Sequence, residues 1–352
     1  VWRLEGETYL PESRPRFVIH SRPAGVGCCG YPEAVYSTMN RRLPVWPLIL
    51  AVPVVLVGAV MIGVAGVPTW GSAIMDLRIH RVLTGFIVGA GLASAGVVMQ
   101  ALLRNPLAEP YVLGVSSGAG LGAAVAVFFG WSAAFAWSVP ATAFIGGVAT
   151  LSLVYALGSS SIYGLLLAGI IVSAVLANLL MLIVSLAPIE GMHSIMWWIL
   201  GNLQLSSQPL MIIGGVIVAI ALIVLTSVGS QLNALTLGRE AAHHLGVRTG
   251  VMIVVCLGLA TLLAATAVAL AGLIGFVGLI VPHVARAWVG PDHRKLPVLA
   301  AVIGGLFLVV CDTLARTVFA PQEIPIGVVT ALVGGPFFLT ILLKRRKGSW
   351  LE

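Results

Sequence analysis

Residues 163–186 read YGLLLAGIIVSAVLANLLMLIVSL and contain no charged side chain. A helix needs about 20 mostly apolar residues to cross the hydrocarbon core of a bilayer, so this run predicts a transmembrane helix. The run lacks the period-two alternation of apolar and polar residues that a strand of a transmembrane barrel would show. The stretch therefore indicates an α-helical membrane protein.

The rest of the chain has the same character. Of its 352 residues, 59% are hydrophobic and only 9% are charged, and the mean hydropathy is +1.07. Soluble domains average about 45–50% apolar and about 25% charged residues. A water-soluble protein of this length needs more charge on its surface, and the same composition excludes a disordered chain. We therefore predict an all-α, polytopic membrane protein.

The sequence predicts ten transmembrane spans. The sixth is interrupted near Ser206-Ser207-Gln208-Pro209, so a short re-entrant piece followed by a full helix is an alternative interpretation there. Asn178 lies in the middle of the fifth span, where we expect it to bond to a neighbouring helix. The predicted spans lie near residues 44–66, 82–103, 111–130, 135–157, 163–186, 194–227, 250–270, 273–289, 296–317 and 325–343.

Residues 1–38 differ from the rest of the chain. They hold four prolines and four arginines, and they lack the apolar core of a secretory signal. Met39 is followed at once by two arginines and the first span, so we hypothesise that Met39 is the true start and that 1–38 are an over-extended reading frame. On this interpretation, residues 39–347 form the transmembrane domain and residues 348–352 form a short tail.

The basic residues predict the orientation of the spans. The net charge is +7, and in a membrane protein such an excess points to cytoplasmic loops. With both termini in the cytoplasm, and residues 1–38 set aside, twelve basic residues lie inside and only Arg78, Arg81 and Arg316 lie outside. The positive-inside rule favours this topology. We find no basic patch interleaved with aromatic residues, so nucleic acid is not an expected partner.

Several functional classes lack the residues that they need. The chain has no G-x-x-x-x-G-K-[ST] phosphate loop, so it cannot hydrolyse ATP by that route. Asp312 is the only acidic residue within the predicted spans, whereas ion-coupled carriers usually bury several carboxylates. An ion-coupled secondary transporter is therefore the disfavoured alternative. We also find no catalytic residue and no metal-ligand cluster, which argues against an intramembrane enzyme.

A stretch between the second and third spans carries a distinct motif. It reads RNPLAEP at residues 104–110 and LGVSSGA at 113–119. Two prolines stop the preceding helix, and Glu109 is expected near the N-terminus of the next one. The cytoplasmic loop motif consists of Arg104, Asn105, Pro106, Glu109 and Pro110.

A second stretch, LGREAAHHLGV at residues 237–247, is a short segment bounded by Gly238 and Gly246. Ala241 and Leu245 are four residues apart and share one helical face. Gly246 suits a helix C-cap. The pattern predicts a short helical stub that docks into a groove on a partner.

With the run FVGLIVPH at 276–283 and the region 312–327, these stretches resemble the permease subunits of type II ABC importers. Those importers carry cobalamin, haem and iron-siderophore chelates, and the resemblance covers roughly residues 42–347. It implies ten helices per subunit and a homodimer in the inner (plasma) membrane. It also implies a cytoplasmic ABC ATPase dimer, an extracytoplasmic substrate-binding protein and a metal-chelate substrate. ATP would act on the partner subunit, and no cofactor is bound covalently to this chain.

The resemblance also implies roles for particular residues. The stub resembles the coupling helix, which sits in a groove of the ATPase and follows its closure. The outward arginines resemble those that pair with glutamates of the binding protein, although His80 stands where the family usually has proline. Arg316 has an alternative role, an ion pair with Asp312. The coupling residues are Gly238, Arg239, Glu240, Ala241, Leu245 and Gly246, and the docking residues are Arg78, Arg81 and Arg316.

The leading prediction is therefore the membrane-spanning half of an ATP-driven metal-chelate importer. The sequence specifies the cargo poorly. The nearly uncharged spans suit a large, amphipathic chelate better than a free cation. The breadth of the family favours a ferric siderophore, with cobalamin or haem next.

Overall fold

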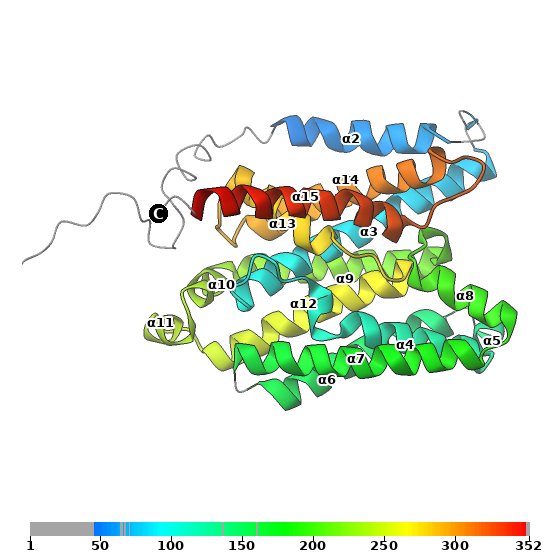
Figure 1. The fold of residues 1–352 in the computed structure, drawn as a ribbon. Helices are drawn as coiled ribbons and strands as arrows, with labels where there is room; N and C mark the ends of the chain where they lie inside the picture. The colour runs from blue at the N-terminus through cyan, green and yellow to red at the C-terminus, as the bar shows by residue number, and fades with distance from the viewer. Residues whose placement is uncertain are drawn as a thin grey trace, which may run out of the picture. The chain divides into compact units, whose positions relative to one another are not determined.

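The structure is a computed structural model that describes residues 46–63, 66, 68–69, 71–135, 137–159 and 161–349. The hypothetical start at Met39 and the extension before it lie outside the described residues, as do the last three residues of the chain. All secondary structure in the described ranges is helical, which confirms the predicted fold class. The helices run lengthwise beside one another (Figure 1).

The helices follow one another with short connections. In the first half they are α2 (Trp46–Met61), α3 (Ala73–Leu102), η1 (Pro110–Leu113), α4 (Val115–Phe128), α5 (Trp131–Ala134), α6 (Ser138–Gly158), α7 (Ile162–Leu186) and α8 (Ile189–Ile199). In the second half they are η2 (Leu203–Leu205), α9 (Gln208–Ser227), α10 (Gly229–Thr236), α11 (Arg239–His244), α12 (Thr249–Ala271), α13 (Val277–Val289), α14 (Leu296–Thr317) and α15 (Ile326–Ser349).

The apolar helices correspond to the ten predicted spans. Among the described residues, six helices are long and apolar enough to cross a membrane, and four shorter apolar helices accompany them. The six long helices are α3, α6, α7, α9, α12 and α14. The interrupted sixth span consists of the short α8, a single 3-10 turn and the full-length α9. The structure agrees with the alternative interpretation in having a short piece before a complete helix, and the re-entrant path of that piece stays a prediction.

One predicted boundary is wrong in an informative way. The second span begins at Ala73 and not near residue 82, because Ser72 caps the helix by accepting a hydrogen bond from the Met75 amide. Arg78 and Arg81 therefore lie in the early turns of α3 and not in a loop. Their charges made this part of the helix look like a connection in the sequence.

α3 is the central helix of the bundle. In its most apolar 18-residue window 83% of residues are buried, against 17% for α7. Glycines allow its neighbours to approach closely: a Cβ on Gly96 would overlap the carbonyl of Gly278 in α13. Gly89 and Gly304 of α14 meet in the same way. Small residues at helix crossings are the usual means of packing helices in lipid.

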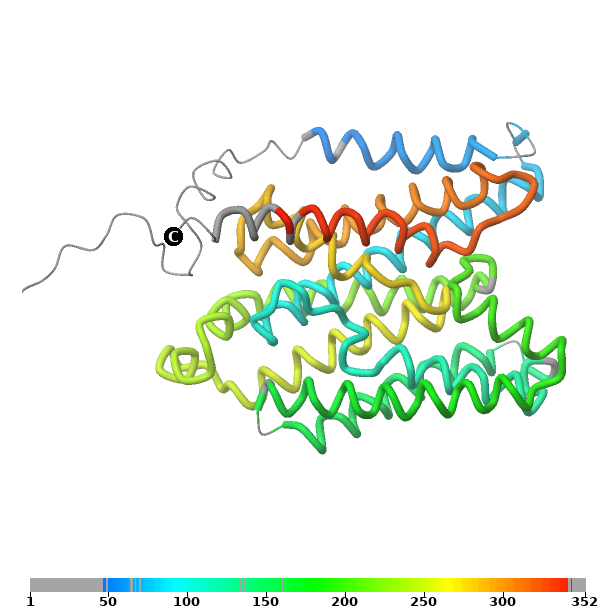
Figure 2. The backbone as a smooth tube through the Cα atoms, viewed as in Figure 1, coloured from blue at the N-terminus to red at the C-terminus, as the bar shows by residue number. Residues whose placement is uncertain are grey.

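The described helices share two ends, which carry different features. The start of α2, the short α11 and the end of α15 lie at one end, here called the α11 end (Figure 1). α5, α8 and the α14–α15 connection lie at the other, here called the α8 end. Figure 2 shows the chain after α3 turning back into the bundle before α4 begins. The predicted site residues gather at these two ends.

Candidate functional site

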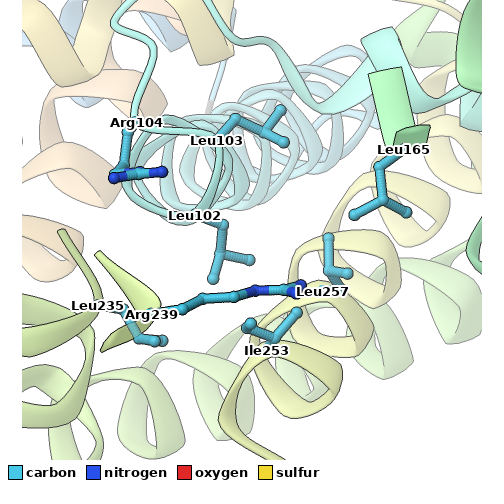
Figure 3. Close-up of a pocket in the computed structure, with 8 residues that line it drawn as sticks. All are labelled: Leu102, Leu103, Arg104, Leu165, Leu235, Arg239, Ile253 and Leu257. Atoms are coloured by element: carbon cyan, nitrogen blue, oxygen red, sulfur yellow. The ribbon is translucent and has the colours of Figure 1, made fainter. Parts of the chain in front are cut away.

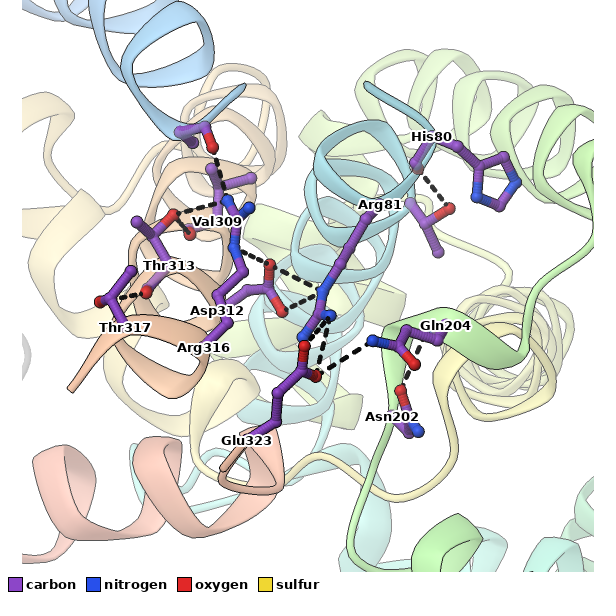
Figure 4. Close-up of polar contacts among 12 residues, drawn as sticks. His80, Arg81, Asn202, Gln204, Val309, Asp312, Thr313, Arg316, Thr317 and Glu323 are labelled. Atoms are coloured by element: carbon purple, nitrogen blue, oxygen red, sulfur yellow. Dashed lines mark hydrogen bonds and ion pairs between the residues drawn. The ribbon is translucent and has the colours of Figure 1, made fainter. Parts of the chain in front are cut away.

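The α8 end holds a network of buried charges centred on Asp312 of α14, which is only 2% exposed. Its carboxylate accepts a hydrogen bond of 2.9 Å from Nε of Arg81 and lies 3.3 Å from Nε of Arg316 (Figure 4). Arg81 also pairs with Glu323 at 3.0 Å, and Glu323 in turn accepts a bond from Gln204. The network joins α3, α14, η2 and the α14–α15 connection.

Two arginines of this region cap the C-terminus of α2. The last carbonyls of a helix have no partner within the helix, and α2 has no basic residue in its last turn. Arg78 donates to the carbonyls of Val60 and Met61 at 3.1 and 3.3 Å. Arg316 donates to the carbonyl of Ala59 at 2.5 Å. Cations at this end also suit the helix dipole, so the two guanidinium groups hold α2 against α3 and α14.

These contacts refine the predicted docking residues. Arg78 and Arg316 are buried, at 8% and 6% exposure, and they bond to this chain's own groups. The alternative ion pair of Arg316 with Asp312 is present. The side chain of Arg81 is 13% exposed and that of Glu323 is 41% exposed, so this pair forms the accessible edge of the network. A docking role for the three arginines stays a prediction.

The sequence reasoning missed two members of the network. Glu323 and Gln204 lie in connections far from α3 along the chain, and no spacing rule relates them to Arg81. His80, the departure from the family pattern, lies within α3, which is helical on both sides of it. The signals in the sequence that pointed to this end were its three basic residues and the family resemblance of the region 312–327.

Replacing Asp312 by Asn should destabilise the protein by about 3–5 kcal/mol, because it leaves two buried guanidinium groups without their countercharge. Replacing Glu323 by Gln should cost at most about 1 kcal/mol, since the Glu323 side chain is 41% exposed and Arg81 keeps its pair with Asp312. Unfolding by SDS in mixed micelles measures both changes in free energy. Equal losses for the two variants would contradict the central position of Asp312.

The α11 end carries the predicted stub, and its helix has the expected boundaries. Gly238 precedes it with φ +114° and Gly246 follows it with φ +83°, conformations that other residues rarely adopt. The amides of Gly246 and Val247 bond to the carbonyls of His243 and Ala242, which forms a Schellman C-cap. The glycine C-cap predicted from the sequence is therefore confirmed.

One face of α11 packs against the bundle, and the opposite face is exposed. Ala242 is fully buried in the main apolar cluster, and Val247 packs against the same cluster. Leu245 is 64% exposed, an unusual position for a leucine at a helix end outside the predicted spans. Arg239 and Glu240 are also exposed. The stub therefore presents a rigid apolar knob flanked by charges.

The loop motif has two parts with different surroundings. Arg104 adopts φ +48° at the end of α3, and the Asn105 side chain accepts a bond from the Leu107 amide, as expected for a polar turn. Glu109, in contrast, turns back into the bundle and accepts a bond of 2.6 Å from the Phe276 amide. Glu109 lies at the N-cap position of the following helix η1, as expected from the sequence, but its side chain makes no cap bond there and bonds instead to the residue that precedes α13. Pro110 lies buried beside it.

The structure brings Arg104 of the loop motif and Arg239 of the stub to one pocket. The other lining residues are apolar and come from α3, α7, α10 and α12. The Arg239 side chain extends across the pocket toward Ile253 and Leu257, whereas the Arg104 side chain lies at the edge of the pocket (Figure 3). The remaining lining residues are Leu102, Leu103, Leu165, Leu235, Ile253 and Leu257. The loop motif and the stub, far apart in the sequence, therefore each contribute one arginine to the lining of the same pocket.

A second polar cluster at this end went unnoticed in the sequence. Asn233 of α10 donates to Asp292 at 2.8 Å and accepts from the backbone amide of His293 at 2.9 Å. Its Oδ1 also lies 2.7 Å from Nδ1 of His293, so this nitrogen carries the proton. Burial and the nearby Arg286 lower the pKa of His293 to about 4. The bond from Asn233 lowers the pKa of Asp292.

These pKa values predict a loss of stability in acid. His293 is neutral in the folded protein down to about pH 4, whereas the unfolded chain takes up a proton near pH 6.5. Stability is therefore complete above pH 6.5 and is lost as the pH falls, by roughly 1 kcal/mol at pH 5.5. A His293→Gln variant should lose less stability than the wild type between pH 7.5 and 5.5 in SDS unfolding. An identical pH profile for both would contradict the assignment.

Comparison with known proteins adds to this geometry. The sequence model of the FecCD transport family matches residues 47–344. The hemin transport system permease protein HmuU of Yersinia pestis is 37% identical over 279 residues, covering 78% of this chain and 84% of that protein. The cobalamin import system permease protein BtuC of Halobacterium salinarum is 38% identical over 292 residues, covering 80% and 76% of the two chains.

The fold is similar to that of a solved structure described as a metal-chelate type ABC transporter in an inward-facing conformation. The TM-score is 0.79 at 32% sequence identity, and the match covers 85% of this chain and 98% of the other.

Proposed function

Because the chain belongs to the FecCD transport family, we propose that it works as the permease subunit of an ATP-binding-cassette importer for a metal chelate. The observation that carries this proposal is the capped α11, which presents Leu245 to the outside of the bundle. A subunit without a phosphate loop needs a mechanical contact through which another protein can move it. A short helix fixed by two glycines provides such a contact.

The partner at α11 is a cytoplasmic ABC ATPase dimer. Its groove receives the apolar knob of Leu245 and Ala241, and its acidic groups face Arg239 and Arg104 around the shared pocket. Closure of the ATPases on ATP then displaces α11 as a rigid body. ATP acts on that partner, and this chain supplies no residue to its hydrolysis.

A second copy of this chain completes the transporter. Asn178 supports this, because it is exposed in the middle of α7 and donates only to the Ala174 carbonyl of its own helix. The expected bond to a neighbouring helix of the same chain is absent from the described residues. Polar groups at the midplane are costly in lipid and face protein or a water-filled path. We infer that this face of α7 lies on the path between two copies.

The α11 end faces the cytoplasm, and both termini lie on that side of the inner (plasma) membrane. The uneven distribution of basic residues supports this orientation, and the start of α2 and the end of α15 share the α11 end (Figure 1). The α8 end is then extracytoplasmic. A substrate-binding protein docks there, beside Arg81 and Glu323.

The cargo is a pre-formed chelate, with a ferric siderophore as the leading candidate and haem or cobalamin next. The similarity to hemin and cobalamin permeases supports a large organic chelate. The alternative, an ion-coupled carrier, would need carboxylates along the path, yet in the described spans the buried Asp312 is already committed to arginines.

The proposal is tested with the chain, its ATPase and its binding protein in liposomes, supplied in turn with a ferric hydroxamate, haemin and cyanocobalamin. We expect vanadate-sensitive, ATP-dependent uptake of one of them. Leu245→Glu should abolish this uptake and leave the bundle folded, because a charge on the knob cannot enter an apolar groove. Leu245→Met, which keeps the knob apolar, should retain uptake. Uptake by the chain alone under an ion gradient would contradict the proposal.

Docking at the α8 end is tested separately by reversing one charge. Arg81→Glu should weaken the affinity for the binding protein, with a larger effect at low salt than at high salt. Exposed ion pairs contribute at most about 1 kcal/mol each, so the expected loss is severalfold. The matched variant Asp76→Asn changes another charge in the first turns of α3 and should leave affinity near the wild-type value. Unchanged binding by Arg81→Glu at low salt would exclude the docking role.

A further inference from the structure

α10 connects the long α9 to the stub α11 and is the least expected helix of the fold. Leu232 is fully buried and Leu235 is 5% exposed, both in the same apolar cluster as Ala242 of α11. The amides of Leu237 and Gly238 bond back to α10, so the chain continues into α11 without a slack linker. α10 and α11 therefore form one short rigid unit.

The polar face of this unit makes hydrogen bonds to the turn before α14. The Asn233 amide makes all the contacts described above: it donates to Asp292 and accepts both from the backbone and from the ring of His293. These partners fix which way the amide points. At the other end of α10, a Cβ on Gly229 would lie 2.7 Å from the carbonyl of His293. Backbone packing and three polar contacts thus join α10 to residues 292–293.

That turn is the beginning of α14. The amides of Lys295 and Leu296 bond to the carbonyl of Asp292, so the turn and the helix are continuous. α14 then runs for 22 residues without interruption, a length of about 33 Å at 1.5 Å per residue. It ends at Asp312 and Arg316, in the charged network at the α8 end. One stiff helix therefore connects the stub to the opposite end of the bundle.

We propose that Asn233 is a positioning residue that makes α14 follow the stub, so that displacement of α11 by the ATPase moves the arginine network at the α8 end. This inference rests on the proposed function, since it assigns the route by which the coupling motion leaves α11. Among the described residues, the side-chain amide of Asn233 bonds only to Asp292 and His293. Loss of that amide frees the helix from the stub.

The test uses the complete transporter in liposomes and the chelate that the wild type takes up. It measures cargo imported per ATP hydrolysed. Asn233→Ala should lower this ratio about fivefold or more, a factor within the range of typical couplings between two sites. The rate of ATP hydrolysis and the thermal stability should change little. Ser230→Ala on the same helix, whose hydroxyl bonds only to Gln231, should keep the wild-type ratio.

A charge exchange keeps the test decisive if the alanine variant does not fold. Asn233→Asp alone places two carboxylates together and should uncouple transport. Combined with Asp292→Asn, it rebuilds the contacts with the roles of amide and carboxylate exchanged, and the ratio should return. A folded double variant that stays uncoupled would overturn the inference.

The remaining outcomes are also distinguishable. A parallel fall of uptake, hydrolysis and stability in Asn233→Ala would show a merely structural tether, and an unchanged ratio would show no tether of consequence; both overturn the inference and leave the proposed function in place. Absence of ATP-driven uptake in the wild type would overturn the proposed function itself.

Discussion

The close approach of α3 to α13 and α14 is the constraint on which the rest of the structure depends. Lipid is as apolar as leucine, so helices in a membrane associate through tight packing and polar contacts. Gly89 against Gly304 and Gly96 against Gly278 let the backbones touch. Next to this seam, Gln100 bonds to the carbonyls of α13 and accepts from Arg286. Because α3 is fixed in this way, its first turns carry Arg78 and Arg81 to α2 and α14.

Two polar clusters at opposite ends of the described bundle satisfy buried charges within the chain. Burying an isolated ion is costly, and a buried pair is stable only with good geometry and further hydrogen bonds. In the network around Asp312, the carboxylates of Asp312 and Glu323 both pair with Arg81, and Asp312 also pairs with Arg316. At the α11 end, the neutral His293 and the ionised Asp292 share one amide. The two arrangements fix opposite ends of α14.

The sequence was sufficient to predict the features that depend on a local pattern of residues. Apolar length predicted the spans, flanking glycines predicted the capped stub, and charge bias led to the arginines. Pairings across the bundle were out of reach. Nothing near Glu109 points to Phe276, and nothing near Asn233 points to His293. The start of α3 was misplaced because arginines that bond to carbonyls inside the protein have the same letters as arginines in a loop.

The capping of α2 by other helices has a consequence for biogenesis. Helices enter the membrane in the order of their synthesis. The hydrogen-bond donor for the Ala59 carbonyl is Arg316, which lies 257 positions later in the chain. Arg78 of α3 can bond to the carbonyls of Val60 and Met61 earlier, but until α14 is inserted the Ala59 carbonyl must be hydrated or held by transient contacts. Among the described helices, α2 is the first in the chain but one of the last to gain all of its contacts, and translation past residue 316 is the earliest moment at which the Ala59 carbonyl can acquire its final partner.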